Sequence, residues 1–224
     1  MATPKLFRLS TEERNKAVDK LVEGASPDAE FYLLLILSTI IITLGLLVDS
    51  STVVIGGMLV APIISPILSF AMSIVMADFE LLFQSAKVLA YSIITVIIIS
   101  LLISLVSLGL EINSEIASRA VTSSEFFFVA LAAGTAAAFA FARPSLSEAI
   151  PGIAVTVALL PPLVVSSVAI PLASFEIFVK SMGLFSLNLL GIIFAATIIF
   201  SLMGFYRQRA EAVKKLEKEI NTPK

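Results

Sequence analysis

The sequence predicts an all-α integral membrane protein, with six transmembrane segments arranged as two inverted repeats of three segments each. Three observations lead to this fold class. Of the 224 residues, 58% are apolar and 14% are charged, whereas soluble domains carry roughly a quarter charged residues. The charged residues lie outside six long apolar runs, and the second half of the chain aligns with the first. A chain of this length cannot bury so much apolar surface in one aqueous core, so an ordinary soluble protein is excluded.

Two residue types that often serve in catalysis and metal binding are absent from the chain. The chain has no histidine and no cysteine, which excludes histidine acid–base catalysis, cysteine nucleophiles and thiolate metal sites. The net charge of −2 provides no basic surface for a nucleic acid. We therefore expect no enzymatic activity, no cofactor, no metal site and no nucleic-acid partner, and the expected environment is the lipid bilayer.

Residues 1–29 are predicted to form a cytoplasmic tail with one short amphipathic helix. Ser10 and Glu13 have the spacing of a capping box, and Gly24 can end a helix that begins near Thr11. The apolar residues of this helix form one stripe, which can lie on the membrane surface or pack beneath the bundle. They are Ala17, Val18, Leu21 and Val22.

The apolar runs set the boundaries of the membrane domain. A helix needs about 20 apolar residues to cross the hydrocarbon, and each run provides this length or nearly so. The runs are residues 31–48, 50–77, 88–110, 126–142, 149–175 and 181–206. We expect one membrane repeat at 30–110 and another at 126–206, joined by a loop at 111–125 and followed by a cytoplasmic C-terminal helix at 207–224.

The distribution of lysine and arginine predicts the orientation. Five of these residues lie before the first run and six lie after the last. If all six runs cross the membrane, thirteen of the fifteen fall on the side of the two tails. Short segments rich in Lys and Arg stay in the cytoplasm. We therefore expect a multi-pass protein of the cell membrane with both termini cytoplasmic.

An internal repeat relates the two halves. A shift of 96 residues places Ala-Asp-Phe-Glu at 77–80 on Ala-Ser-Phe-Glu at 173–176. The same shift places Gly56 on Gly152. Each half contains three runs, an odd number, so the second half enters the membrane from the opposite side. Inverted repeats of this kind are common in secondary transporters, whose substrate site lies near the membrane midplane.

Prolines interrupt the second and fifth runs at corresponding places. Pro62 and Pro66 interrupt the second run, Pro161 and Pro162 interrupt the fifth, and the 96-residue shift pairs Pro66 with Pro162. Each proline removes one backbone donor, so we expect both spans to be broken and to expose backbone carbonyls there. Freed carbonyls in a membrane must be buried or line a wet cavity. The alternatives are a kink that only shapes packing, and two re-entrant segments that leave four spans.

The candidate substrate or ion pathway consists of the Gly/Pro segments, the hydroxyl groups near them and the one amide within a run. No Asp, Glu, Lys or Arg lies deep in a run, which argues against a proton pump. A single serine or threonine can equally bond its own helix backbone, and the amide can bond a neighbouring helix. The pathway residues are Gly56, Gly57, Ala61, Pro62, Ser65, Pro66, Gly152, Thr156, Pro161, Pro162, Ser166 and Asn188.

Polar residues at the ends of the runs form a candidate vestibule. Asp49, Ser50 and Ser51 follow the first run, while Arg143 and Glu148 follow the fourth. The first group can instead cap the second span, and Arg143 can be a cytoplasmic anchor. A cation vestibule and a structural cap are therefore both open for Asp49.

We expect a membrane transport protein, channel-like or a secondary carrier, for a small solute or ion. Its site would lie near the midplane, on the broken second and fifth spans. The alternative is a non-transporting scaffold or lipid-binding protein that works as an oligomer. The alanine-rich segment 132–138 favours close helix approach, either centrally or at the interface of a homo-oligomer.

Five strings of the sequence resemble a known family, and one of them is Pro-Ile-Leu at residues 66–68. Residues 44–50 read Leu-Gly-Leu-Leu-Val-Asp-Ser, and residues 54–62 read Val-Ile-Gly-Gly-Met-Leu-Val-Ala-Pro. Residues 151–155 read Pro-Gly-Ile-Ala-Val, and residues 158–163 read Ala-Leu-Leu-Pro-Pro-Leu. Together they resemble the prokaryotic uncharacterised hydrophobic domain family, domain of unknown function 389, over roughly residues 30–205. The resemblance implies a membrane fold and assigns no substrate and no role to any residue.

Overall fold

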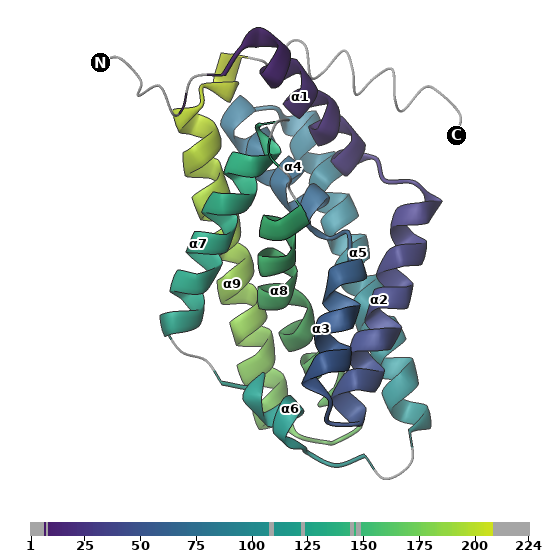
Figure 1. Ribbon diagram of the computed structural model, residues 1–224. Coiled ribbons are helices and arrows are strands. Elements are labelled where there is room, and N and C mark those ends of the chain that lie inside the picture. The colour runs from purple at the N-terminus through teal and green to yellow at the C-terminus, as the bar shows by residue number, and fades with distance from the viewer. Residues whose placement is uncertain are drawn as a thin grey trace.

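The computed structural model describes residues 7, 9–107, 110–121, 124–143, 146 and 149–207. In these residues every regular element is a helix (Figure 1), so the all-α fold class is confirmed. The expected C-terminal helix at 207–224 lies outside the described residues, apart from its first residue. The helices are α1 (Thr11–Ala25), α2 (Ala29–Leu47), α3 (Ser51–Val60), α4 (Ile64–Met76), α5 (Phe79–Val106), α6 (Ser114–Ser118), α7 (Ser124–Phe141), α8 (Ala149–Val168), α9 (Phe175–Leu202) and the 3-10 helix η2 (Phe205–Arg207).

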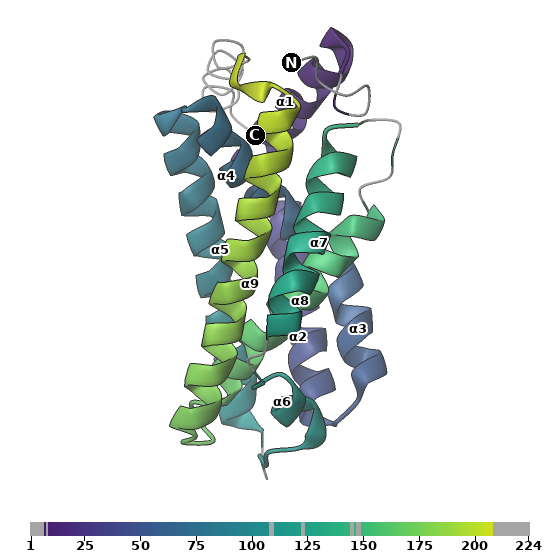
Figure 2. The same ribbon diagram turned by 90° about the vertical axis from the view of Figure 1, so that its left-hand side faces the viewer.

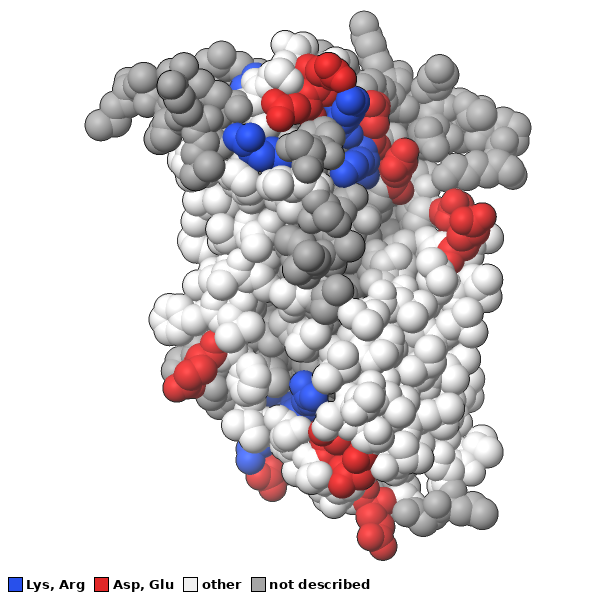
Figure 3. Space-filling model, in the orientation of Figure 1, with Lys and Arg blue, Asp and Glu red and all other residues white. Residues whose placement is uncertain are grey.

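Three helices, α2, α5 and α9, are long and apolar enough to cross a membrane. The helices α3 and α4 pass the same test together, but the chain bends by 55° between them. Large apolar side chains are exposed on the outside of the bundle, among them Leu33 on α2, Leu102 on α5 and Phe194 on α9. Figure 3 shows the charged residues gathered toward the two ends of the molecule, with an uncharged band between them. These features suggest a membrane protein, while six crossings stay a prediction.

The long helices of the two halves run in opposite directions (Figures 1 and 2). Helix α5 begins at the end of the bundle covered by α1 and ends near α6, whereas α9 runs from the α6 end to the α1 end. The bounds of these two helices differ by 96 residues at both ends. Ala77 and Ala173, which the same shift pairs, both have left-handed backbone just before these helices, with φ of 51° and 50°. The 96-residue correspondence in the sequence thus recurs in the local structure.

Helix α1 begins at the predicted capping box. The Ser10 N–H donates to Glu13 Oε2 at 2.7 Å, and the Glu13 N–H donates to Ser10 Oγ at 3.1 Å. Because the Ser10 N–H stabilises the carboxylate, the pKa of Glu13 lies below its usual value. The expected short helix is confirmed, and it extends to Ala25.

The apolar stripe of α1 packs across one end of the bundle, against α4 and α5 (Figure 1). Ala17, Val18 and Val22 are buried there, whereas the side chain of Leu21 lies outside the described part. A Cβ on Gly24 would lie 2.9 Å from the Ser65 carbonyl oxygen of α4. Of the two locations predicted for this helix, the structure shows the one in contact with the bundle.

Cationic side chains of α1 contact the ends of two other helices. Arg14 Nη2 donates to the Met203 carbonyl oxygen at 3.2 Å, where α9 ends. Lys20 Nζ lies 5.7 Å from the centroid of the Phe141 ring at the end of α7. A helix end leaves carbonyls without backbone donors, so Arg14 both satisfies such a group and attaches α1 to α9.

The alanine-rich helix α7 packs closely on α9, as expected for small residues. A Cβ on Gly134 would lie 2.8 Å from both the Cα and the carbonyl oxygen of Ile192. Gly191 on α9 leaves room for the Phe127 ring in the same way, since a Cβ there would lie 3.0 Å from that ring. Because backbone meets backbone at Gly134, the neighbouring atoms cannot rotate away from an added side chain.

Gly134→Ala is expected to destabilise the protein by about 1–3 kcal/mol, because the added methyl group would overlap the Ile192 backbone. Gly183→Ala is the matched control, since a Cβ there meets nothing within 4 Å. The control should be neutral or stabilise its helix by up to about 1 kcal/mol. Thermal unfolding of the detergent-purified proteins measures both effects, and equal melting temperatures would contradict the tight contact.

Candidate functional site

The second span is broken where the sequence predicts a break. Helix α3 ends at Val60, α4 begins at Ile64, and the chain bends by 55° between them. Ala61 is extended, with φ −73° and ψ 123°, which is the geometry that a following proline favours. Pro62 is half-buried and has no N–H to give to the carbonyl of Met58. The break therefore combines a change of direction with a loss of backbone bonding.

Pro66 does not take part in the break, contrary to the prediction. It is the third residue of α4, in the first turn, where N–H groups have no partner within the helix in any case. Pro66 is buried, and Ser65 beside it is half-buried. The two interruptions predicted for this span thus reduce to one, at residues 61–63.

Gly57 joins the broken span to α2. A Cβ on Gly57 would lie 2.7 Å from the Ile42 side chain, so glycine lets α2 and α3 approach this closely. The Ser38 hydroxyl of α2 donates to the Gly57 carbonyl oxygen at 2.8 Å. This carbonyl is one of the last four of α3, which lack donors within the helix. The sequence carries no local signal for the role of Ser38, because the two residues are 19 positions apart.

The prediction of a break in the fifth span is wrong. Helix α8 is continuous through Pro161 and Pro162, and both prolines are buried. The prolines still deprive the carbonyls of Val157 and Ala158 of their donors in the helix. Asn188 on α9 compensates for one of them, because its Nδ2 donates to the Ala158 carbonyl oxygen at 2.8 Å. The helix thus continues through both prolines, and a neighbouring element supplies a hydrogen bond to one of the two freed carbonyls.

The other predicted pathway residues are only partly brought together. Gly152 is buried, and a Cβ there would lie 3.4 Å from Ile64, so the beginning of α8 lies beside the break. Thr156 and Ser166 donate to carbonyls of their own helix at 3.0 and 2.6 Å, which is the common use of hydroxyl groups in helices. Gly56 is exposed, with nothing within 4 Å of a Cβ, and faces away from the bundle.

Asp49 anchors helix α6 and does not cap the second span. It has left-handed backbone with φ 55°. Its carboxylate accepts from Ser114 Oγ at 2.9 Å and from the Glu115 N–H at 2.8 Å, both at the start of α6. Asn113 Nδ2 donates to the Leu46 carbonyl oxygen of α2 at 2.6 Å. Because the carboxylate is used by a helix N-terminus, the structure favours the structural role over a cation vestibule.

The remaining vestibule residues do not assemble around Asp49. Ser50 is the N-cap residue of α3 but makes no side-chain cap bond, and the Ser51 hydroxyl donates to the Glu115 carboxylate. The Arg143 guanidinium lies at the other end of the bundle, 5.0 Å from the centroid of a phenylalanine ring of α7. Glu148 lies outside the described residues.

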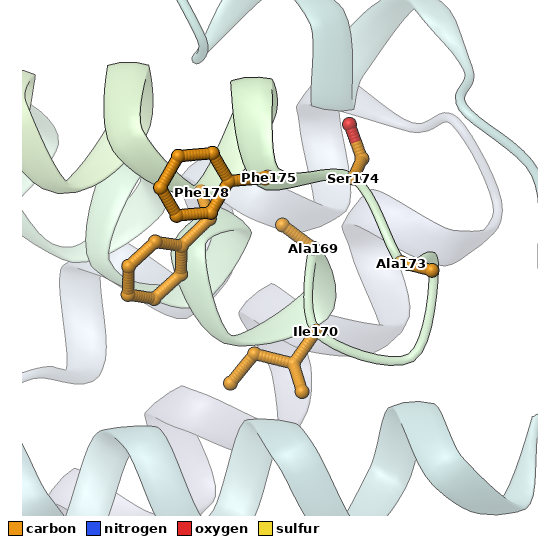
Figure 4. Close-up of a pocket in the computed structure, with 6 residues that line it drawn as sticks. All are labelled: Ala169, Ile170, Ala173, Ser174, Phe175 and Phe178. Atoms are coloured by element: carbon orange, nitrogen blue, oxygen red, sulfur yellow. The ribbon is translucent and has the colours of Figure 1, made fainter.

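A cavity of about 410 Å³ lies away from these residues, at the turn between α8 and α9 (Figure 4). Its lining is apolar except for Ser174, which caps α9 by accepting from the Ile177 N–H at 3.5 Å. Figure 4 shows the rings of Phe175 and Phe178 close together on one side of this turn. The described residues that line this cavity include none of the predicted pathway residues, so it is distinct from the expected midplane site.

Asp49→Ala removes the acceptor at the start of α6 and should weaken the attachment of this helix by about 1 kcal/mol. The backbone amides of residues 114–118 should then exchange with deuterium faster, while those of α9 keep their rate. Glu111→Ala, which changes an exposed acid of the same loop, is the control and should leave the exchange unchanged. If α6 exchanges at the wild-type rate in Asp49→Ala, the helix does not depend on this carboxylate.

Comparison with known proteins places this geometry in a family. The family described as "Domain of unknown function (DUF389)" matches residues 58–194, which include the break, α8 and Asn188. An uncharacterised protein of Methanocaldococcus jannaschii is 33% identical over 181 residues, which cover 80% of this chain and 56% of that protein. The chain thus spans about half the length of this curated relative. No solved structure matches the chain. The chain belongs to the DUF389 family.

Proposed function

We propose that the protein is a membrane transport protein, channel-like or a secondary carrier, for a small solute or ion. The observation that carries the proposal is the break at residues 61–63 within an otherwise apolar span. Non-helical backbone is tolerated at membrane depth only where it is buried in protein or lines a water-filled cavity. The half-helix ends at such a break carry partial charges that can bind ions or polar solutes. The pathway then passes the break, Gly57 and Gly152.

Repeat symmetry supports this proposal. The equal lengths and opposite directions of α5 and α9, together with the paired left-handed alanines, are what inverted repeats produce. We accordingly propose six crossings, with the apolar helices α7 and α8 as the shorter spans. The small exposed residues Ala132 and Ala136 on the outer face of α7 fit the close approach of a second copy, so the proposed state is a homo-oligomer.

The charges support an orientation with both termini in the cytoplasm. Among the Lys and Arg side chains that the structure describes, Arg119 and Lys180 lie toward the α6 end of the bundle. The end of a membrane protein that is richer in Lys and Arg faces the cytoplasm. The described Lys and Arg nearer the α1 end are more numerous, namely Arg14, Lys16, Lys20, Lys87 and Arg143. We therefore propose that α1 lies on the cytoplasmic side and α6 on the outside.

Pro62→Leu tests the pathway, because it returns an N–H donor to the Met58 carbonyl and favours one continuous helix. Flux should fall at least about tenfold, the effect of raising a barrier by about 1.4 kcal/mol. The measurement uses the full chain in proteoliposomes, with Na⁺, K⁺, chloride, phosphate, ammonia and urea as solutes. Pro171→Ala changes a proline in the turn between α8 and α9 and should keep wild-type flux.

Equal membrane insertion of the three proteins, measured by vesicle flotation, makes the comparison valid. Wild-type flux in an inserted Pro62→Leu variant would remove the break from the pathway. If the wild-type protein moves none of these solutes and a lipid copurifies with it, the non-transporting scaffold or lipid-binding function is favoured.

A further inference from the structure

One unpaired hydrogen-bond acceptor lies in the interior beside α8, on Asn188 of α9. Pro161 and Pro162 deprive the carbonyls of Val157 and Ala158 of their helical donors. Asn188 gives one N–H to Ala158 but brings a carbonyl oxygen of its own. Asn188 is 2% exposed, and its Oδ1 has no hydrogen-bond partner among the described residues. Because buried polar atoms are nearly always paired, this acceptor is an expected place for a donor that is not among the described residues, such as a water or a solute molecule.

The surroundings of this acceptor decide which donor fits. No Asp, Glu, Lys or Arg occurs in the runs 149–175 and 181–206, which contain α8 and most of α9. An ion that bound here would lose its hydration shell, and no opposite charge in these runs would compensate for that loss. An alkali cation needs a ring of carbonyl oxygens to replace its hydration shell, and the single oxygen of Asn188 does not form one. An anion would be repelled by the lone pairs of Asn188 Oδ1.

We propose that this position is the solute-binding point of the pathway and that it selects a small uncharged molecule that donates a hydrogen bond, such as water, ammonia or a small amide. The proposal rests on the transport function proposed above, and it names the class of solute. The solute donates a hydrogen bond to Asn188 Oδ1. Because Nδ2 is held by Ala158, the amide presents its oxygen to the solute.

The test measures the permeability of proteoliposomes that contain the full chain. Stopped-flow light scattering reports water and urea, an internal pH dye reports ammonia, and Na⁺, K⁺, chloride and phosphate fluxes are measured on the same vesicles. The wild-type protein should raise the permeability to at least one uncharged solute above that of protein-free vesicles and carry none of the ions. Asn188→Leu should lower this permeability about tenfold, as expected for the loss of a hydrogen bond.

Ser181→Ala is the matched control. Ser181 is a buried polar residue of α9 like Asn188, but its hydroxyl donates to carbonyls of its own helix, Ile177 and Phe178. Its removal should leave the permeability unchanged. An equal loss in both variants would overturn the proposal, because the effect would then follow from any polar deletion in α9.

Asn188→Leu also leaves the Ala158 carbonyl without a donor, so this variant can fail to fold for a structural reason. The double variant Pro162→Ala/Asn188→Leu separates the two roles, because residue 162 then supplies the N–H and the helix no longer needs the amide. This variant should melt near the wild-type temperature and keep the low permeability. Permeability that recovers together with stability would overturn the proposal, since Asn188 would then act only on the helix.

The wild-type fluxes distinguish this inference from the function on which it rests. A protein that carries ions but no uncharged solute would overturn the inference and leave the transport function standing. A protein that carries neither would overturn both. A protein that carries an uncharged solute and loses this flux in the double variant supports both.

Discussion

Backbone hydrogen bonding in an apolar interior is the constraint on which this structure depends. A helix end or a proline leaves carbonyls without donors, and lipid cannot supply them. Each side chain that supplies such a donor from another element also ties two elements together, so satisfying the backbone and assembling the bundle are one process. Among the described residues, bonds of this kind run from Arg14 to Met203, from Ser38 to Gly57, from Asn113 to Leu46 and from Asn188 to Ala158.

These hydrogen bonds are short, so the helices that they join must also lie in close contact. Gly24, Gly57 and Gly134 bring the backbone of one helix against α4, α2 and α9, where a Cβ would meet atoms within 3 Å. In a membrane, apolar side chains pack on lipid as readily as on each other, so small residues and polar bonds hold helices together. Gly56 and Gly183 are helical glycines of the same kind, yet a Cβ at either meets nothing within 4 Å. A glycine's importance therefore depends on its neighbours in space.

The two halves of the chain meet the same constraint in different ways. In the first half Pro62 follows an extended Ala61, and the span divides into α3 and α4. In the second half the matching position is Ala158, whose carbonyl accepts from Asn188, and α8 is continuous. In the proposed mechanism the first half contributes the break and the second contributes the acceptor on Asn188, so the pathway needs both halves.

Residues that are neighbours in the chain are sufficient to predict the helical membrane class, the capping box at Ser10 and the break at Pro62, because each depends on local composition or local geometry. They are insufficient for Asp49, whose partner Ser114 is 65 residues away. They also mislead at α8, which is continuous and whose Ala158 carbonyl accepts from Asn188, 30 residues away. A proline always removes a donor, which the sequence alone determines. Whether the helix then breaks depends on the elements packed against it, such as α9 with Asn188 at the Ala158 carbonyl, and only the tertiary structure decides this.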